Sequence, residues 1–526
     1  MRSTALCYCL PIVNDEFSYD RLPYPSKFFV QTFPGRLATQ ALLFGMDPAA
    51  ADTSTVLELG CGNGSNLIAQ AYLMPQARFT GIDLSKVHID EAKAAAAELG
   101  LGNVEFHQAD VMEMSAAAFG RFDYIAAHGL FSWVPEAVRT RVLELFRELL
   151  GPNGVGYISY STFPGAHERQ ITQQAMRFAS RGIEDPAEKV ERALGFLKFA
   201  AEQSSNRGTY GQILVRELRR HGTRDLADVF HDDLAELNTP FYFHEFAEML
   251  AANGLQFLAE AELHAMGTAD MTAAARKFIS SIDDVIEREQ YLDIFRGRAF
   301  RQSLVVHSEV SLDRDMKPGV LDRLLISSSL RPAGRSPDLA GNGRVKFAGN
   351  SGQQIEIDMP LAKIALEKLG SIWPRAVAFM ELSAEARKQA AGLSDDEADK
   401  QAEAFRDMLF QIATATDLVE LHTFQPSASA ELAEKPKLSR LARWQMRSAR
   451  NVISGFGVDM EIADPVSRRL LELLDGKRSR SAMFDELGKF IRSSHEIDGK
   501  KELLATLPEW LDESLAHLAR LGMFEG

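Results

Sequence analysis

The chain has 526 residues, of which 46% are hydrophobic and 25% charged, a globular composition that excludes a disordered or fibrous protein. Because a single core rarely grows beyond about 250–300 residues, we expect several domains. Acidic residues outnumber basic ones, 73 to 58, and the net charge of −15 makes nucleic acid a poor first choice of partner. No apolar run approaches the roughly 18 residues that span a bilayer, so we expect no membrane insertion.

The cysteines and the amino terminus give little sign of an oxidising compartment. Cys7 and Cys9 lie in the amino-terminal tail and Cys61 in a glycine-rich loop, which provides neither a disulfide framework nor a paired C-x-x-C zinc site. The first residues hold one arginine and a short apolar stretch, without a clear small-residue cleavage site. We therefore expect a cytoplasmic protein.

Between residues 55 and 161 the pattern alternates strand and helix. Helices are expected at Lys86–Leu99 and Glu136–Leu150. Such alternation favours right-handed crossovers and a parallel sheet. The expected strands are Thr55–Leu59, Arg78–Leu84, Val104–Gln108, Phe122–Ala127 and Gly154–Tyr160.

The next region, 167–238, is helical and polar in pattern, without strand signals. A helix at His244–Asn253 and strands at Leu255–Glu260 and Phe300–Val306 follow. A doubly wound sheet could use these two strands as its last ones. The helices at 167–238 would then be an insertion over the edge of the sheet where ligands bind.

The carboxy-terminal third is mostly helical. A stretch at 331–352 rich in Gly, Pro, Ser and Asn reads as a linker, and a hairpin is expected from Val345 to Ile357. A faint repeat aligns the segment beginning at Pro360 with the one beginning at Pro465. This pattern suggests two winged-helix-like units, with chance similarity of leucine-rich helices as the alternative.

The strongest chemical signal is Val56-Leu57-Glu58-Leu59-Gly60-Cys61-Gly62-Asn63-Gly64, where an apolar strand runs into three alternate glycines and a helix. Glycines let the backbone turn tightly and approach a ligand, and the helix terminus offers free N–H groups. A dinucleotide fingerprint has one more residue before its last glycine. The charge of Glu58 would repel a pyrophosphate and suits a cationic ligand instead. A purely structural turn is the alternative.

Acidic residues end the next two strands. Asp83 can accept hydrogen bonds from both hydroxyls of a ribose, each contributing roughly 1.5–3 kcal/mol, with a helix cap as the alternative. Asp110 can accept from an exocyclic adenine amine, although strand-end acids are common. Adenosine next to a positive centre indicates S-adenosylmethionine.

On these residues the sequence resembles the class I methyltransferases over roughly residues 50–165. The resemblance implies a Rossmann-like α/β sheet with S-adenosylmethionine as the cofactor. The residues that it places in the cofactor site are Tyr24, Glu58, Gly60, Cys61, Gly62, Asn63, Gly64, Asp83, Leu84, Asp110, Val111, His128 and Gly129.

A narrower resemblance covers most of the chain. It rests on the segments Tyr19–Ser26, Pro34–Ala38, His128–Pro135, Ser159–Gly165, His231–Leu234, Asn238–Phe243 and Gly254–Glu260. These are similar to bacterial protein-lysine methyltransferases that modify an outer-membrane protein. The resemblance implies a methyltransferase regulatory domain and a helical, winged-helix-like carboxy-terminal part. Ser161 and Ala166 depart from the subgroup pattern, which has Asn and an aromatic there, and leave the substrate open.

Methyl transfer is an in-line displacement, so the protein mainly has to position both partners and exclude water. A lysine acceptor, with an ordinary pKa of about 10.4, must first lose a proton, which an apolar pocket favours. We expect Phe131 and Trp133 to wall this pocket. His128 is a candidate general base, or its backbone holds the cofactor amine. Tyr160 is a candidate to orient the acceptor nitrogen, with a core tyrosine as the alternative.

Two groups of residues give weaker signals. Metal-ligand types at 231–233 and 244–245 have no recognised spacing, so we expect a solvated surface and no metal site. A basic stretch could bind an acidic partner, although a solvated connector or internal ion pairs fit such runs better. It contains Lys435, Lys437, Arg440, Arg443, Arg447 and Arg450.

The expected domains are a cofactor-binding core with an amino-terminal cap (1–165), a helical regulatory region with the last core strands (166–310), a first winged-helix-like unit (311–430), and a basic connector with a second unit (431–526).

The favoured function is N-methylation of lysine in a protein substrate. The alternatives are a small-molecule methyltransferase in natural-product tailoring and a non-catalytic cofactor sensor. A closed, narrow pocket under the helical insertion would favour a small acceptor, and an open groove reaching the carboxy-terminal units would favour a protein.

Overall fold

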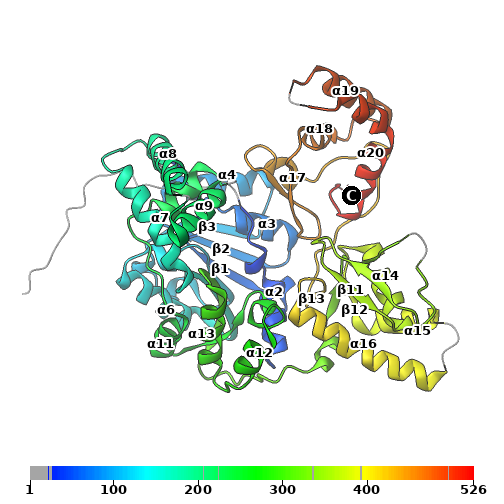
Figure 1. Ribbon diagram of the computed structural model, residues 1–526, viewed down its shortest axis with the longest axis horizontal. Helices are drawn as coiled ribbons and strands as arrows, with labels where there is room; N and C mark the ends of the chain where they lie inside the picture. The colour runs from blue at the N-terminus through cyan, green and yellow to red at the C-terminus, as the bar shows by residue number, and fades with distance from the viewer. Residues whose placement is uncertain are drawn as a thin grey trace, which may run out of the picture.

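A computed structural model describes residues 22, 27–204, 206–222, 224–334, 337–390, 394–495 and 497–525 (Figure 1). Cys7, Cys9 and Tyr24, with the predicted place of Tyr24 in the cofactor site, lie outside these residues. Within them, no helix is both long and apolar enough to cross a membrane.

The core of the described chain is a seven-stranded sheet in the order β3-β2-β1-β4-β5-β7-β6. The neighbouring strands from β3 to β5 are parallel, while β7 is antiparallel to β5 and to β6. This arrangement confirms the predicted α/β fold class, including the last two strands. The strands are β1 (Thr55–Leu59), β2 (Arg78–Asp83), β3 (Val104–Gln108), β4 (Phe122–Ala127), β5 (Leu150–Ser161), β6 (Leu255–Glu260) and β7 (Phe300–His307).

Helices cover both faces of this sheet. Strand side chains alternate between the faces, so Val56 joins the core under one set of helices and Leu57 the core under the other. The first set contains α2 (Pro34–Leu43), α3 (Ser65–Leu73) and α4 (Lys86–Leu99). The second contains α5 (Ala116–Phe119), α6 (Glu136–Leu149), α11 (Phe243–Ala252) and α13 (Val285–Arg296).

The predicted helical insertion lies between β5 and β6. It has a small core of its own, built from Met176, Val190, Leu197 and Leu214 among others. Because its first helix begins just after β5 ends, the insertion starts at the carboxyl edge of the parallel strands. Its helices are α7 (Gly165–Ala179), α8 (Pro186–Ser204), α9 (Gly208–His221) and α10 (Leu226–Asp228), and α12 (Ala273–Ser280) follows β6.

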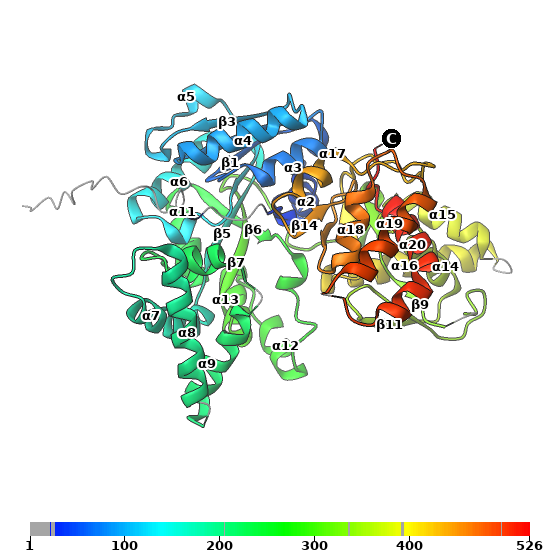
Figure 2. The same cartoon turned by 90° about the horizontal axis from the view of Figure 1, so that it is seen from above.

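The carboxy-terminal third forms two units with the same order of elements, lying to one side of the core (Figure 2). In the first, β8 (Leu325–Ser327) and β9 (Arg331–Pro332) precede a hairpin of β10 (Val345–Ala348) and β11 (Gln354–Ile357), which confirms the predicted hairpin. The remaining elements are α14 (Pro360–Ile372), β12 (Val377–Ala378), α15 (Phe379–Gln389), α16 (Asp395–Ala415) and β13 (Glu420–His422).

The second unit repeats this order after α17 (Arg440–Gln445). Single bridges from Lys437 to Asp475 and from Leu438 to Phe524 take the places of the β8–β12 and β8–β13 pairs. The third helices, α16 and α20, each have 21 residues. The faint repeat in the sequence therefore corresponds to a repeated fold. The other elements are β14 (Asn451–Ile453), β15 (Asp459–Glu461), α18 (Pro465–Leu473), α19 (Arg480–Ser493) and α20 (Lys500–Arg520).

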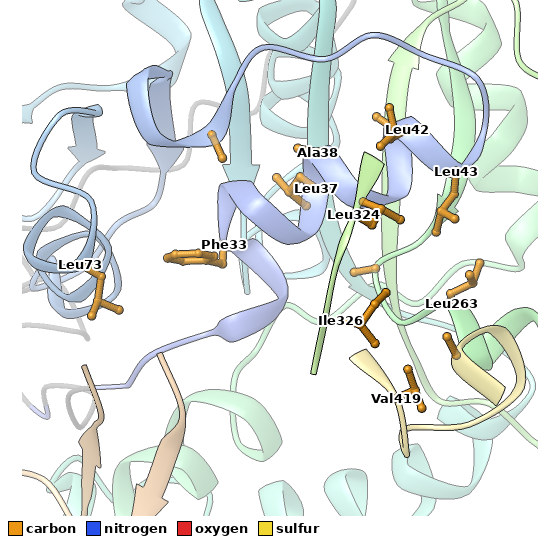
Figure 3. Close-up of a cluster of buried hydrophobic side chains, with 14 of the residues drawn as sticks. Phe33, Leu37, Ala38, Leu42, Leu43, Leu73, Leu263, Leu324, Ile326 and Val419 are labelled. Carbon is orange, nitrogen blue, oxygen red and sulfur yellow. The ribbon is translucent and has the colours of Figure 1, made fainter. Parts of the chain in front are cut away.

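Helix α2 joins the sheet to the first carboxy-terminal unit. Its Leu37 packs in one cluster with Leu324 and Ile326 of that unit (Figure 3). The hydroxyl of Thr39 accepts a hydrogen bond from the backbone N–H of Thr423 at 3.0 Å. These contacts attach the first carboxy-terminal unit to the core.

Three of the six basic side chains of the basic stretch form ion pairs inside the chain. Lys437 and Arg443 both pair with Glu525, and Arg447 pairs with Glu98 of α4. For these three side chains, the interpretation as internal ion pairs is confirmed.

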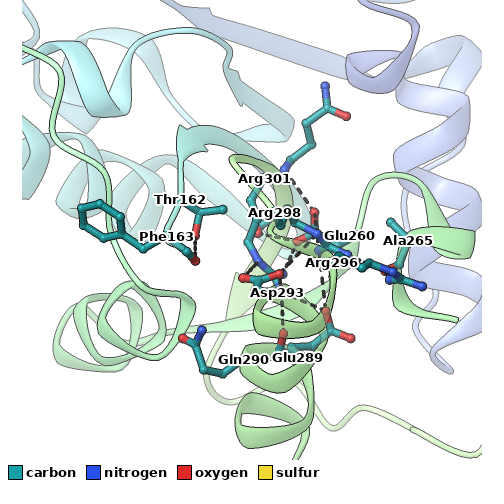
Figure 4. A network of polar contacts seen from close by, with 12 residues as sticks. Thr162, Phe163, Glu260, Ala265, Glu289, Gln290, Asp293, Arg296, Arg298 and Arg301 are labelled. Carbon is teal, nitrogen blue, oxygen red and sulfur yellow. Dashed lines mark hydrogen bonds and ion pairs between the residues drawn. The ribbon is translucent and has the colours of Figure 1, made fainter. Parts of the chain in front are cut away.

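A buried charge network fastens the last strands to α13 (Figure 4). Arg301 of β7 is fully buried and donates to Glu260 at 2.7 Å, Asp293 at 2.8 Å and Glu289 at 3.1 Å. Its guanidinium also lies 3.9 Å from the ring centroid of Phe243. Arg298 lies beside the same three carboxylates, with its Nε 3.2 Å from Asp293. Two cations thus compensate three carboxylates from β6 and α13, and Arg301 is the one that donates hydrogen bonds to all three.

We predict that Arg301→Ala lowers the free energy of unfolding by about 3–5 kcal/mol, because three buried carboxylates lose the cation that donates hydrogen bonds to them and keep only Arg298. Chemical denaturation, followed through the first unfolding transition, measures this change. Lys198→Ala, at an exposed position of α8, is the control and should change it by less than about 0.5 kcal/mol. Equal stability of the two variants would contradict the prediction.

Candidate active site

The glycine loop between β1 and α3 combines tight packing with open space. Gly60, Gly62 and Gly64 all have positive φ, at 74°, 53° and 74°. A Cβ on Gly64 would lie 2.6 Å from the ring of Phe106, whereas a Cβ on Gly62 would meet nothing within 4 Å. Gly64 is therefore required for packing, and the backbone at Gly62 is left open to a ligand.

Glu58, at the end of β1, is a buried carboxylate with one oxygen unsatisfied. Its Oε1 accepts from Asn66 Nδ2 at 2.9 Å, while Oε2 has no hydrogen-bond partner in the described residues. Burial, together with the nearby charge of Asp83, raises the pKa of Glu58 to about 8. A cation beside this carboxylate would stabilise its charged form, which fits the positively charged cofactor that the sequence predicts.

Asn66 also ties the amino-terminal segment to the loop, a role that sequence analysis missed. Its Oδ1 accepts from the backbone N–H of Phe29 at 3.0 Å, and its Nδ2 donates to Thr32 Oγ1 at 3.0 Å. Gln70 donates to the same hydroxyl at 2.9 Å. The available signal was a pair of amide side chains, four residues apart, on a helix that is otherwise apolar.

Asp83 is fixed by two backbone bonds. Its Oδ2 accepts from Gly62 N at 2.8 Å and its Oδ1 from Ser85 N at 2.9 Å. Each carboxylate oxygen retains a lone pair for a further bond, so these contacts orient the group without blocking it.

Asp110 is more exposed and caps a short 3₁₀-helix (Val111–Glu113) by accepting from Met112 N at 2.9 Å. The apolar side chains of Leu84 and Met112, near the ends of β2 and β3, are 50% and 45% exposed. Uncovered apolar surface next to an acidic group suits a planar base.

The side chains of Cys61 and Asn63 both make contacts that shape the loop. The thiol of Cys61 packs against Gly81, and its N–H donates to Ile82 O at 3.0 Å. Asn63 Oδ1 accepts from the hydroxyl of Ser65 at 2.6 Å.

His128 follows β4 and is enclosed by aromatic rings. Its ring stacks on Phe29 at 3.7 Å between centroids, and its Nδ1 lies 2.8 Å from the hydroxyl of Tyr157. Burial, and then the charge of Lys27, lowers the pKa of His128 to about 3. A neutral ring with so low a pKa is a poor acceptor for a lysine proton, which disfavours the predicted general base. The backbone N–H of Gly129 donates to Ser159 Oγ at 2.8 Å.

The prediction that Tyr160 orients the acceptor is wrong. Tyr160 is fully buried, stacks on Phe246 at 4.1 Å and has its hydroxyl 3.3 Å from Ser303 Oγ. Because strand side chains alternate, the tyrosine that reaches His128 is Tyr157, three residues earlier. Tyr157 and Tyr160 lie in the same predicted strand. Only the face of β5 on which each side chain lies distinguishes them.

The two aromatic residues that were predicted to wall the acceptor pocket, Phe131 and Trp133, also differ in their burial. Phe131 is fully buried in the core, against Tyr160 and Phe246, so its assignment to the acceptor pocket is wrong. Trp133 is half-buried and lines a pocket of about 110 Å³ with Ser161 and Phe300. The ring of Phe300 lies 6.4 Å from that of His128, which places one wall of the pocket near the end of β4.

The pocket is walled on its other side by the helical insertion. Arg220 donates to Asp233 at 2.8 Å, and Arg224 pairs with both Asp232 and Asp233. His231 and Asp233 are buried, at 3% and 2% exposure, so the expected solvated surface is wrong for them. In the described residues, no group of three or more His, Cys, Asp or Glu side chains could hold a metal ion.

Three segments match known families. Residues 51–205 match "Methyltransferase domain", residues 226–307 "Predicted methyltransferase regulatory domain", and residues 434–523 "PKMT, C-terminal winged helix domain". The uncharacterized protein RP789 of Rickettsia prowazekii (strain Madrid E) is 27% identical over 508 residues, covering 93% of this chain and 90% of the relative. The uncharacterized protein RP028 of the same organism is 35% identical over 236 residues, covering 45% of this chain and 94% of the relative.

Among solved structures, PKMT2 from Rickettsia typhi in complex with AdoHcy matches with a TM-score of 0.83 and 26% identity. The match covers 96% of this chain and 100% of that one. The chain belongs to the class I methyltransferases. It is an S-adenosylmethionine-dependent enzyme with a methyltransferase regulatory domain and a PKMT-type winged-helix domain. The predicted domain boundaries at 165, 310 and 430 stay predictions. The methyltransferase sheet takes strands from both sides of the boundary at 165.

We predict that the affinity of this methyltransferase for S-adenosylmethionine rises with pH and levels off above about 8. Glu58, with its raised pKa, is protonated in the free protein below that value, and a bound cation favours the carboxylate, so binding releases a proton. Titration calorimetry at several pH values, in buffers of different ionisation enthalpy, measures both effects. Glu58→Gln should bind S-adenosylmethionine more weakly and without this pH dependence. An unchanged dependence of affinity on pH in that variant would contradict the role of Glu58 as the group that releases the proton.

Proposed function

We propose that the protein transfers the methyl group of S-adenosylmethionine to the side-chain amine of lysine in a protein substrate. The observation that carries the proposal is the match to PKMT2 of Rickettsia typhi over nearly the whole of both chains, with the carboxy-terminal winged-helix domain included. A catalytic core alone would be shared with methyltransferases of many substrates. Shared accessory units favour a shared kind of acceptor.

On this proposal, the cofactor is held at the carboxyl edge of β1 to β4 and supplies an electrophilic methyl group on a sulfonium. Glu58 faces the cationic part of the cofactor. Asp83 accepts from the ribose hydroxyls, and Asp110 accepts from adenine. Leu84 and Val111 provide apolar contacts for the base. The open backbone at Gly62 allows the ligand to lie close to the loop.

The acceptor enters the pocket that Trp133, Ser161 and Phe300 line. The ammonium of lysine is disfavoured there, because Trp133 and Phe300 solvate a charge poorly and the positive charge of Arg169 lines the same pocket. The neutral amine forms the new N–C bond while the bond from sulfur to the methyl carbon breaks, and the product ammonium afterwards loses its proton to solvent. Burial and the charge of Lys27 keep His128 neutral, so His128 acts as a wall of the site and does not take the proton.

A small-molecule acceptor is the second candidate, because the pocket is narrow and no residue of the carboxy-terminal units lines it. Such a pocket under the helical insertion is what a tailoring enzyme would have. A narrow pocket is equally what a single lysine side chain needs when the rest of the substrate stays outside. The pocket therefore does not separate the two candidates, and the accessory units favour lysine.

Transfer of label from methyl-labelled S-adenosylmethionine tests the proposal. The purified protein is incubated with a cell extract that is afterwards split into macromolecular and small-molecule fractions. We predict label in the protein fraction, on lysine by mass spectrometry, and none with Asp83→Ala. Label confined to the small-molecule fraction would overturn the lysine assignment and leave the cofactor site standing.

A further inference from the structure

We infer that the acceptor pocket recognises a carboxylate next to the methylated amine, and that Arg169 binds this carboxylate. The inference rests on the proposed function and specifies its substrate as lysine flanked by an acidic residue. Arg169 lies on α7 and lines the pocket together with Trp133 and Asn238.

Within the described residues, Arg169 differs from the other two arginines of the pocket in forming no direct ion pair. The charges of Arg220 and Arg224 are compensated by Asp233, Asp232 and, for Arg220, by Glu217 at 2.8 Å. Among the residues that the structure places, none forms an ion pair with Arg169. Burial and the neighbouring charge of Arg220 lower the pKa of Arg169, and the attraction of Glu217 and Asp233 offsets this only in part. An anion in direct contact with Arg169 would stabilise its charge further. A carboxylate matches the planar donor fork of arginine.

Two neighbouring side chains carry polar atoms that nothing in the described chain satisfies. Trp133 Nε1 and Asn238 Oδ1 are both buried and both lack a hydrogen-bond partner. The first can only donate and the second can only accept. Buried polar atoms without partners are rare in folded proteins, so such a pair in one pocket wall calls for a ligand with an acceptor and a donor. A carboxylate and an amine on adjacent residues supply these groups.

The size of the pocket decides how such a substrate would bind. At about 110 Å³ it is smaller than a cavity of about 150 Å³ that holds benzene, so it admits one side chain and no folded segment. Lysine occupies the pocket, and the flanking acidic residue reaches Arg169, which is partly exposed at its wall. The whole protein carries a net charge of −15, which repels an acidic peptide. A preference for an acidic residue beside the lysine must therefore come from Arg169.

Binding of two short peptides, Gly-Lys-Asp-Gly and Gly-Lys-Asn-Gly, to the full chain with S-adenosylhomocysteine tests the inference. We expect the Asp peptide to bind about tenfold or more tightly, as a charge-assisted hydrogen bond allows. Arg169→Gln should remove the preference, and Arg169→Glu should transfer it to Gly-Lys-Lys-Gly. Arg192→Gln, an exposed arginine on α8 outside the pocket, is the control and should retain it.

Equal binding of the two peptides, or a preference that persists in Arg169→Gln, would overturn the inference. Methyl transfer to the same peptides separates this result from the proposed function. Transfer with no acidic preference contradicts only the role of Arg169. Arg169-dependent binding without any transfer supports the carboxylate site and overturns the lysine assignment.

Discussion

The hydrogen-bond chain from Glu58 through Asn66 to Thr32 organises the cofactor end of this protein. A buried carboxylate is unfavourable unless it is bonded, and here one amide satisfies half of it while the other half is left for a cation. The same amide holds Phe29 and Thr32 in place, and Phe29 covers His128. The amino-terminal segment, the glycine loop and the end of β4 are thus set relative to one another by a single side chain.

The chemistry around His128 follows from this enclosure. Burial and the charge of Lys27 keep the ring neutral, so the site provides shape and desolvation, with no strong base. Methyl transfer from a sulfonium suits such a site, because the electrophile is already activated and the acceptor needs only to be neutral and well placed. Arg301 acts at a distance from this chemistry, fixing α13 to the strands beside the pocket.

Much of this fold could be predicted from the sequence, because strands and glycines leave local patterns. The strands from Thr55 onward, the glycine loop and the strand-end position of Asp83 depend on residues close together in the chain. Tyr160 was misassigned because parity at the end of β5 depends on how the strand pairs with β4 and β7. The arginines of the acceptor pocket were missed because residues 169, 220 and 233 meet only through the packing of α7 against α9 and the π-helix Val229–Asp233.

The carboxy-terminal units extend the molecule without lining the pocket. They contact the core through α2 and through the ion pair of Arg447 with Glu98, so their position is tied to the segment that covers the cofactor edge. In a protein methyltransferase, such units would hold the body of the substrate while one side chain enters the narrow pocket.

The cofactor site at the ends of β1, β2 and β3 is tested most directly by one calorimetric measurement. Asp83→Ala, shown to be folded by circular dichroism, is titrated with S-adenosylmethionine beside the unchanged protein. Loss of the ribose bonds should weaken binding by about 2–3 kcal/mol. Unchanged affinity in the folded variant would contradict the site assignment.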